Sequence, residues 1–392
     1  MSSKATPSGV QFPTDAKGQR STTSAGKKIW AAAASPVDQK AADALTAEKD
    51  WRHKYGKHVM ALADLQMKSP EVALSAARAG LESVYSSFEF IRDGKTSKLS
   101  EAMDSLTSES FSTGTIQGNK TLDPATRKIV MPYKGKTQES ADVLKTVTML
   151  SAAGALEPDV AAAMTELHSH PEWLDLSQKV FVLIGATSEM CPFKTLMSLG
   201  ATVVAIARPS KRLNKLVEQT RSSPGTLILP LSAPQTEGMS DEDVCALAGA
   251  DVLTQAPEIR NWLLSVAPGK QLVIGSYIYL DGEAHVRASV AMDAIVSGVC
   301  KGRPGCALTY LATPSNGYPI PQEAYDDSKK RLKDVPWWHG LMSTVLGRFD
   351  KTARPQVPSA DGSTQFCIFD GLTVVQGPNY ALAKTIQVGP NI

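Results

Sequence analysis

The densest cluster of polar side chains in the sequence spans residues 275–287 and follows a short apolar run. Its members that could do chemistry are Tyr277, Tyr279, Asp281, His285 and Arg287. A tyrosine can donate a proton, a histidine is a base near neutral pH, and an arginine can bind an anion, so this set predicts proton transfer. In an extended chain Tyr277 and Tyr279 point to opposite sides, so only one can face a cleft. The alternative is structural, with Asp281 capping a helix and the His and Arg at the surface.

A second group of residues, after the apolar run VFVLI, suits an anion. The turn contains Gly185, Ala186, Thr187, Ser188 and Glu189. Gly185 permits a tight turn, and backbone N–H groups at a following helix start can bind a pyrophosphate. A dinucleotide fingerprint has two further glycines, where this chain has residues such as Glu189 and Cys191. A plain strand-to-helix turn therefore remains the alternative. Cys191 is either a packing residue or a thiol activated by the helix dipole.

Two further segments would complete a dinucleotide site. The run ATVVAIA ends at Arg208 and Ser210, followed by Lys211 and Arg212. An acidic residue at this place favours NAD, whereas an arginine accommodates the 2′-phosphate of NADP, so the sequence favours NADP over NAD. Gln255 lies in a turn of small residues that could flank the nicotinamide ribose. The competing interpretation is a solvated helix start with incidental basic residues.

The elements that must position these residues follow from the apolar pattern. Short β-branched runs cover residues 180–186, 201–207, 226–232, 250–256, 271–277 and 306–312. Helix-length segments separate them, which requires crossover connections and predicts a parallel sheet covered on both faces. Ligands of such a sheet bind beyond the carboxyl ends of its strands. We therefore predict an α/β fold with a doubly wound parallel sheet.

The first part of the chain has a different pattern. Residues 1–36 are polar and weakly periodic, which predicts a flexible tail. Residues 37–172 predict a helical region, with helix starts at Ser69-Pro70, near Thr137 and at Glu157-Pro158, and with an irregular stretch over 108–136. Residues 173–392 form the predicted nucleotide-binding domain. The part of the chain before residue 173 carries no chemical motif and is expected to be a helical cap or an oligomerisation element.

Composition excludes several classes of protein. The 392 residues carry 41 Lys and Arg against 39 Asp and Glu, so the net charge of +2 gives no electrostatic case for nucleic acid or a membrane surface. Five cysteines without a C-x-x-C pair argue against a zinc ribbon or disulfide framework, and no metal site is predicted. A reducing compartment, the cytoplasm, is expected. Organelle import through the basic N-terminal segment is the alternative.

Two family resemblances add to this interpretation. The glycine turn and GATVVAIARPSKRL resemble the short-chain dehydrogenase/reductase family, whose Tyr-x-x-x-Lys motif matches Tyr325 to Lys329. That resemblance implies Tyr325 as acid/base and Lys329 as the residue that lowers its pKa, with Thr313 or Ser315 as hydroxyl partners.

The second resemblance covers more of the chain. The motifs PYKGK (132–136), HPEWLDLSQKVFVLIGATSEMCP (170–192), ADVLTQAPEI (250–259), GSYIYLDGEAHVR (275–287) and QGPNYALAK (376–384) are together similar to an uncharacterised, dehydrogenase-like family of Rossmann-like proteins. The resemblance implies a Rossmann-like fold and a nucleotide site without an assigned reaction. It also suggests that relatives extend further at the C-terminus.

The function expected from the sequence is an NADP(H)-dependent oxidoreductase that acts on a small carbonyl or alcohol substrate. The alternative is a non-catalytic Rossmann scaffold that binds a nucleotide as a structural ligand or binds a partner protein. Methyl or acyl transfer with another nucleotide ligand is a third option that rests on fold analogy alone. Trp337, Trp338 and Leu341 favour packing or a subunit contact, so a homo-oligomer is considered.

Overall fold

A six-stranded sheet lies at the centre of the molecule, which we describe from a computed structural model. The structure describes residues 7–15, 17–124, 127–313, 315–338, 341–342, 354–358, 365–372 and 375–388. The strand order is β11-β10-β7-β8-β9-β4. The strands are β4 (Ser112–Gln117), β7 (Val180–Ile184), β8 (Thr202–Ile206), β9 (Thr226–Leu231), β10 (Leu272–Ser276) and β11 (Ala307–Tyr310).

Five of these strands run parallel, and β4 pairs with β9 in the antiparallel direction. Alternate residues of each strand enter opposite cores: Val182 and Ile184 pack on one face, and Leu183 packs on the other. Both faces are buried, which explains why the strands are almost continuously apolar. The predicted α/β architecture with a parallel sheet is confirmed, and its strand order is compatible with a Rossmann-like fold.

Helices cover both faces of the sheet. One face packs against α8 (Phe193–Ser198), α9 (Lys211–Arg221) and α10 (Asp241–Leu247). The other packs against α11 (Ala256–Ser265) and α12 (Gly282–Gly302), with Trp262 of α11 fully buried. From β7 the chain passes to β8 on one side, and β10 lies on the other, so the strand order reverses between β7 and β10.

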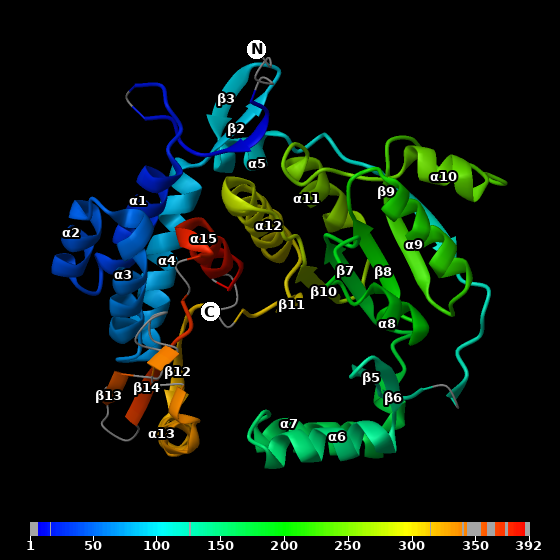
Figure 1. Cartoon of the computed structure of the whole chain (residues 1–392). Coiled ribbons are helices and arrows are strands. Elements are labelled where there is room, and N and C mark those ends of the chain that lie inside the picture. Colours follow the sequence, from blue (N-terminus) through cyan, green and yellow to red (C-terminus); the bar gives the residue numbers. More distant parts are fainter. Residues whose placement is uncertain are drawn as a thin grey trace.

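A layer of helices packs on α12 from the side away from the sheet. It comprises α1 (Thr22–Ala34), α2 (Gln39–Ala47), α3 (Trp51–Gln66), α4 (Pro70–Ser87) and the C-terminal α15 (Gly377–Val388). Figure 1 shows α15 between α12 and the blue helices α1–α4. The predicted start of α4 is confirmed: Ser69 Oγ accepts a hydrogen bond from Val72 N at 3.3 Å, and Pro70 occupies the first turn. One apolar core runs from this layer into the sheet.

Smaller elements surround this framework. The first three strands, β1 (Gly9–Gln11), β2 (Glu89–Arg92) and β3 (Lys95–Lys98), form a sheet that is followed by α5 (Leu99–Ser105). A hairpin of β5 (Val130–Tyr133) and β6 (Lys136–Glu139) leads to α6 (Ala141–Ala152), α7 (Pro158–Ser169) and η2 (Pro171–Leu174). The third sheet contains β12 (Gly317–Pro321), β13 (Arg354–Pro358) and β14 (Gln365–Asp370), beside α13 (Gln322–Arg331) and η3 (Leu332–Asp334).

Three expectations from the sequence are wrong. Residues 250–255 form a turn rather than a strand, because the Asp251 carboxylate accepts a hydrogen bond from Leu253 N at 2.8 Å and closes the chain on itself. The segment 1–36 is not a flexible tail over its described part: it contains β1 and α1, and Val10 is fully buried. Within the predicted irregular stretch 108–136, β4 joins the central sheet. Of the two roles expected for Trp337, packing or a subunit contact, its 84% exposure among the described residues leaves the subunit contact as a prediction.

Candidate functional site

The strand-end cavity, which we define as the hollow beyond the carboxyl ends of β7, β8 and β10, has a volume of about 570 Å³. It lies where the strand order reverses, the place at which open α/β sheets bind ligands. Its walls come from residues 185–190, 206–212, 250–253 and 278–284. The residues with polar side chains in these walls are Thr187, Ser188, Glu189, Arg208, Arg212, Asp251 and Tyr279.

Gly185 shapes the first wall. Its φ of +96° is unfavourable for other residues, and a Cβ there would lie 2.7 Å from Ile278 Cγ1 and 2.8 Å from Ile278 N. The glycine lets the turn after β7 pass directly under the segment that follows β10. Thr187, Ser188 and Glu189 line the cavity as predicted, whereas Ala186 is 2% exposed and packs in the core.

The backbone of this turn is largely engaged with itself. Gly185 N and Ala186 N donate to Ile206 O at 2.8 and 3.1 Å, and Ser188 N donates to Gly185 O at 2.9 Å. Cys191 N donates to Ser188 O at 3.1 Å, and α8 begins only at Phe193 and has six residues. Fewer N–H groups are therefore directed at a ligand than in a glycine-rich turn. Burial raises the pKa of the Cys191 thiol to about 12, so the activated-thiol interpretation is not supported.

Basic side chains form the second wall. Arg208 follows β8 and Arg212 lies in the first turn of α9, and both line the cavity. Ser210, a predicted cofactor residue, caps α9 instead: its Oγ accepts a hydrogen bond from Leu213 N at 3.3 Å. Lys211 is exposed and lies outside the lining set. Two guanidinium groups at one end make that end attractive to a phosphate.

The third wall is the turn of residues 250–253. Gln255, predicted to contact a cofactor, instead stabilises this turn, because its Oε1 accepts a hydrogen bond from Asp251 N at 3.0 Å. The turn is fixed from outside by β1, because Val10 N donates to Leu253 O at 2.7 Å. Asp251 and the apolar residues around it, rather than Gln255, line the cavity.

The two tyrosines after β10 separate as predicted. Tyr277 is 7% exposed and packs on the α8–α9 side of the sheet, where burial raises its pKa. Tyr279 is 56% exposed and lines the cavity. Its ring lies 5.0 Å from the His285 ring and 6.2 Å from the Tyr380 ring, measured between centroids. Tyr279 is therefore the tyrosine that a cavity ligand would meet.

His285 lies behind Tyr279 and is 1% exposed. Burial, helped by the positive charge of Lys384 and opposed by Asp281, lowers its pKa to about 4, so the ring is neutral near pH 7. The Gln387 amide nitrogen lies 3.5 Å from His285 Nε2 and donates to Ser289 Oγ at 3.2 Å. The predicted helix-face pair of His285 and Ser289 thus meets α15, and a neutral imidazole faces the tyrosine.

Arg287 does not belong to the site. Its Nε donates to Val10 O at 2.6 Å, and its Nη1 lies 4.0 Å from a Glu283 carboxylate oxygen. Since this places the guanidinium against β1, the predicted anion clamp is wrong. Arg287 instead connects α12 to the strand that holds the 250–253 turn.

The Tyr-x-x-x-Lys pair is also placed elsewhere. Tyr325 and Lys329 lie on α13, beside the third sheet and away from the ends of β7, β8 and β10 (Figure 1). Lys329 Nζ lies 5.3 Å from the centre of the Tyr325 ring. Thr313, the expected hydroxyl partner, is 2.9 Å from the hydroxyl of Tyr380. The structure therefore does not bring this pair into the strand-end cavity.

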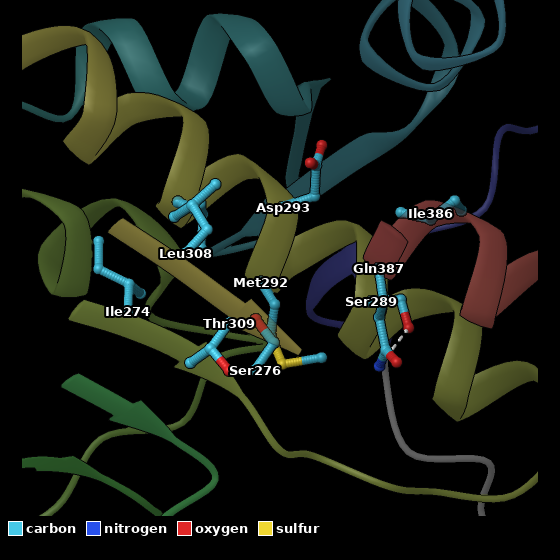
Figure 2. Close-up of a pocket in the computed structure, with 10 residues that line it drawn as sticks. Ile274, Ser276, Ser289, Met292, Asp293, Leu308, Thr309, Ile386 and Gln387 are labelled. Atoms are coloured by element: carbon cyan, nitrogen blue, oxygen red, sulfur yellow. Dashed lines mark hydrogen bonds between the residues drawn. The ribbon is translucent and has the colours of Figure 1, made fainter. Parts of the chain in front are cut away.

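Sequence reasoning missed three residues of α15. Tyr380 packs against Tyr279 and His285, Gln387 lies beside His285, and Lys384 Nζ donates to Gln387 Oε1 at 3.0 Å. They belong to the motif QGPNYALAK and the residues that follow it, so the signal was present although no role was assigned. Figure 2 shows the Ser289–Gln387 hydrogen bond and Asp293 pointing away from Ser276 and Thr309. These residues line a separate cavity of about 20 Å³, enough for one water molecule.

Comparison with protein-family models, with curated proteins and with solved structures found no match to this chain. In the part of the chain that the structure describes, no helix combines the length and the apolar character needed to cross a bilayer. Those same residues contain no group of three or more His, Cys, Asp or Glu side chains arranged to hold a metal ion. The functional argument therefore depends on the strand-end cavity.

Proposed function

We propose that the protein is a Rossmann-like oxidoreductase that binds NADP(H) in the strand-end cavity and acts on a small carbonyl or alcohol substrate. One observation carries the proposal: Arg208 and Arg212 share a cavity with the Gly185 turn at the point where the strand order reverses. Arginines beyond the second parallel strand are the residues that accommodate a 2′-phosphate.

The other end of the cavity would hold the substrate. Tyr279 presents its hydroxyl-bearing ring there, and it would donate the proton to a carbonyl oxygen. The neutral His285 packs against Tyr279 and would act as a positioning residue. The apolar residues Ile278, Leu280 and Ala284 would limit the substrate to a small one.

A second candidate function is a scaffold that binds a nucleotide without turnover. It is favoured by the turn after β7, because four of its N–H groups already donate to backbone carbonyls. A pyrophosphate would then be held by fewer donors than in a catalytic dinucleotide site. The two functions differ in turnover rather than in nucleotide binding.

Calorimetric titration with NADPH and NADH tests the cofactor. We expect NADPH to bind at least tenfold more tightly than NADH, and we expect Arg208→Glu to abolish this preference. Lys211→Glu is the matched control, since it makes the same charge change outside the cavity and should retain the preference. If the folded wild-type chain binds neither nucleotide, the proposal is wrong.

Turnover separates enzyme from scaffold. NADPH oxidation is followed over a panel of small carbonyl compounds with the wild-type chain, Tyr279→Phe and Tyr325→Phe. Loss of at least a hundredfold in kcat for Tyr279→Phe, with Tyr325→Phe unchanged, would support the oxidoreductase. A protein that binds NADPH but turns over none of the panel would instead support the scaffold.

A further inference from the structure

A second cavity lies in the helical layer, and none of the residues that line it also lines the strand-end cavity. The helical cavity, as we name it, has a volume of about 230 Å³ and is enclosed by α1, α3, α4, α15 and residues 316–318. Most of the side chains around it are otherwise buried, including Trp30 at 5% and Ile386 at 3% exposure. It is therefore a space within the helix packing that opens to solvent on the side of its partly exposed residues, such as Gln66 and Leu81.

Small residues create this space. Ala33 of α1, Ala63 of α3, and Ala76, Ala77 and Gly80 of α4 all line it. A Cβ on Gly80 of α4 would lie only 3.3 Å from Ala33 Cβ of α1, so the two helices touch at this point. Well-packed interiors hold few voids larger than a water molecule, and an empty void destabilises a protein in proportion to its volume. Covering the apolar walls of a space of this size with a ligand would therefore be favourable.

The chemistry of the walls limits what can fill it. The lining residues include no Asp, Glu, Lys, Arg or His. Among the polar ones, the Tyr318 hydroxyl donates to Thr313 O, Thr385 Oγ1 donates to Ala381 O, and Asn316 Oδ1 accepts from Gly317 N. A charged ligand would lose its hydration without gaining a counter-ion, which is strongly unfavourable. The half-buried Gln66 at the end of α3 is one amide that could meet a single polar group.

Size narrows the ligand class further. Apolar protein cavities of about 150 Å³ are known to bind benzene. The helical cavity is larger, so it would accommodate a somewhat larger molecule, such as a medium-chain aliphatic alcohol. Since its walls come from four helices and residues 316–318, a ligand that fits within them is compact or flexible rather than long.

We propose that the helical cavity is a binding site for a small neutral apolar molecule with at most one polar group, of the class of medium-chain alcohols. This site is separate from the strand-end cavity, and the proposal does not depend on the nucleotide-binding function. Helix α15 contributes Leu382 and Ile386 to it.

The test uses the full chain and two probes that share an alkyl chain, neutral 1-octanol and anionic octanoate. We expect 1-octanol to bind, to raise the thermal unfolding midpoint and to shift the fluorescence of Trp30, one of six tryptophans, so that Trp30→Phe removes the spectral change. Octanoate should bind at least tenfold more weakly.

A second test uses substitutions that fill the helical cavity with larger side chains. Ala77→Leu and Ala63→Leu place side chains into the space and should each weaken 1-octanol binding at least tenfold. Ala73→Leu, on α4 but outside the lining set, is the matched control and should bind normally. The proposal is overturned if the folded wild-type chain does not bind 1-octanol, if octanoate binds equally well, or if both filled variants bind as the wild type does.

Discussion

The two cavities are built in different ways. Each wall of the strand-end cavity is a short continuous segment that directly follows a strand or precedes a helix. The helical cavity, in contrast, takes scattered residues from α1, α3, α4 and α15, which span residues 22–388. A site at the ends of parallel strands is therefore built from short sequence segments, whereas a site between packed helices is built from residues far apart in the sequence.

Helix α12 carries two buried ionisable side chains that meet different helices of the helical layer. His285 meets α15 beside the strand-end cavity, and Asp293 interacts with Tyr85 of α4. Tyr85 influences the Asp293 carboxyl, but neither Asp293 oxygen has a partner with hydrogen-bond geometry among the described residues. Burial raises the pKa of the Asp293 carboxyl and lowers that of the His285 imidazole, so the two groups should make stability depend on pH in opposite directions.

The largest effect is expected where the strand-end cavity depends on one backbone conformation. Gly185→Ala should destabilise the protein by about 4 kcal/mol, because a strained positive φ and a steric clash each cost about 1–3 kcal/mol. The measurement is the free energy of unfolding in urea.

Gly282→Ala is the control for Gly185→Ala. Gly282 also has a positive φ, +57°, but no atom lies within 4 Å of its added Cβ. Gly282→Ala should therefore lower the free energy of unfolding by only about 1–2 kcal/mol, which is the strain of the left-handed conformation. Equal losses in both variants would show that contact with Ile278 does not shape the turn.

The contrast between local motifs and distributed residues explains what the sequence could predict. The parallel strands, the Gly185 turn and the start of α4 at Ser69 and Pro70 each follow from local pattern, and the structure has them. Residues 250–256 show the same apolar pattern, yet the Asp251 side chain closes a turn there. The apolar pattern does not reveal a competing side chain-to-backbone hydrogen bond.

Other failures have a long-range cause. The interaction between Arg287 and Val10 joins residues 277 positions apart, and Gln387 lies 102 positions from His285. Neither contact leaves a periodic signal. The tail assignment failed for the same reason, since β1 is short and is ordered by β2 and the 250–253 turn.

The next effect concerns the side of α12 that faces α4. Burial raises the pKa of Asp293 to about 7 from an ordinary 3.8. Because the pKa of Asp293 is higher in the folded state than in the unfolded state, its protonation stabilises the fold. This contribution to the free energy of unfolding is fully present below about pH 4 and is lost as the pH rises through 7. Asp293→Asn should remove this loss, so the variant should gain about 3 kcal/mol relative to wild type between pH 5 and pH 8. Urea unfolding at the two pH values measures it, and parallel curves for both proteins would contradict it.

The opposite pH dependence is expected on the side of α12 that meets α15. His285 has a folded pKa of about 4, below the ordinary 6.5, so stability is lost as the pH falls from about 6.5 toward 4. His285→Gln should reduce the loss between pH 7 and pH 5 by about 2 kcal/mol. His53→Gln, which makes the same replacement at an exposed histidine of α3, is the matched control variant.

The smallest effect tests whether the strand-end cavity extends to α13. Tyr380→Phe should cost about 1 kcal/mol, because its hydroxyl pairs with that of Thr313 at 2.9 Å. Tyr325→Phe keeps the ring against Lys329 and should change the free energy of unfolding by less than about 0.5 kcal/mol. NADPH titration of both variants completes the comparison, since only Tyr380 contacts Tyr279, which lines the cavity. A loss of NADPH binding in Tyr325→Phe alone would place the nucleotide at α13, and the division of the molecule into two separate cavities would then have to be redrawn.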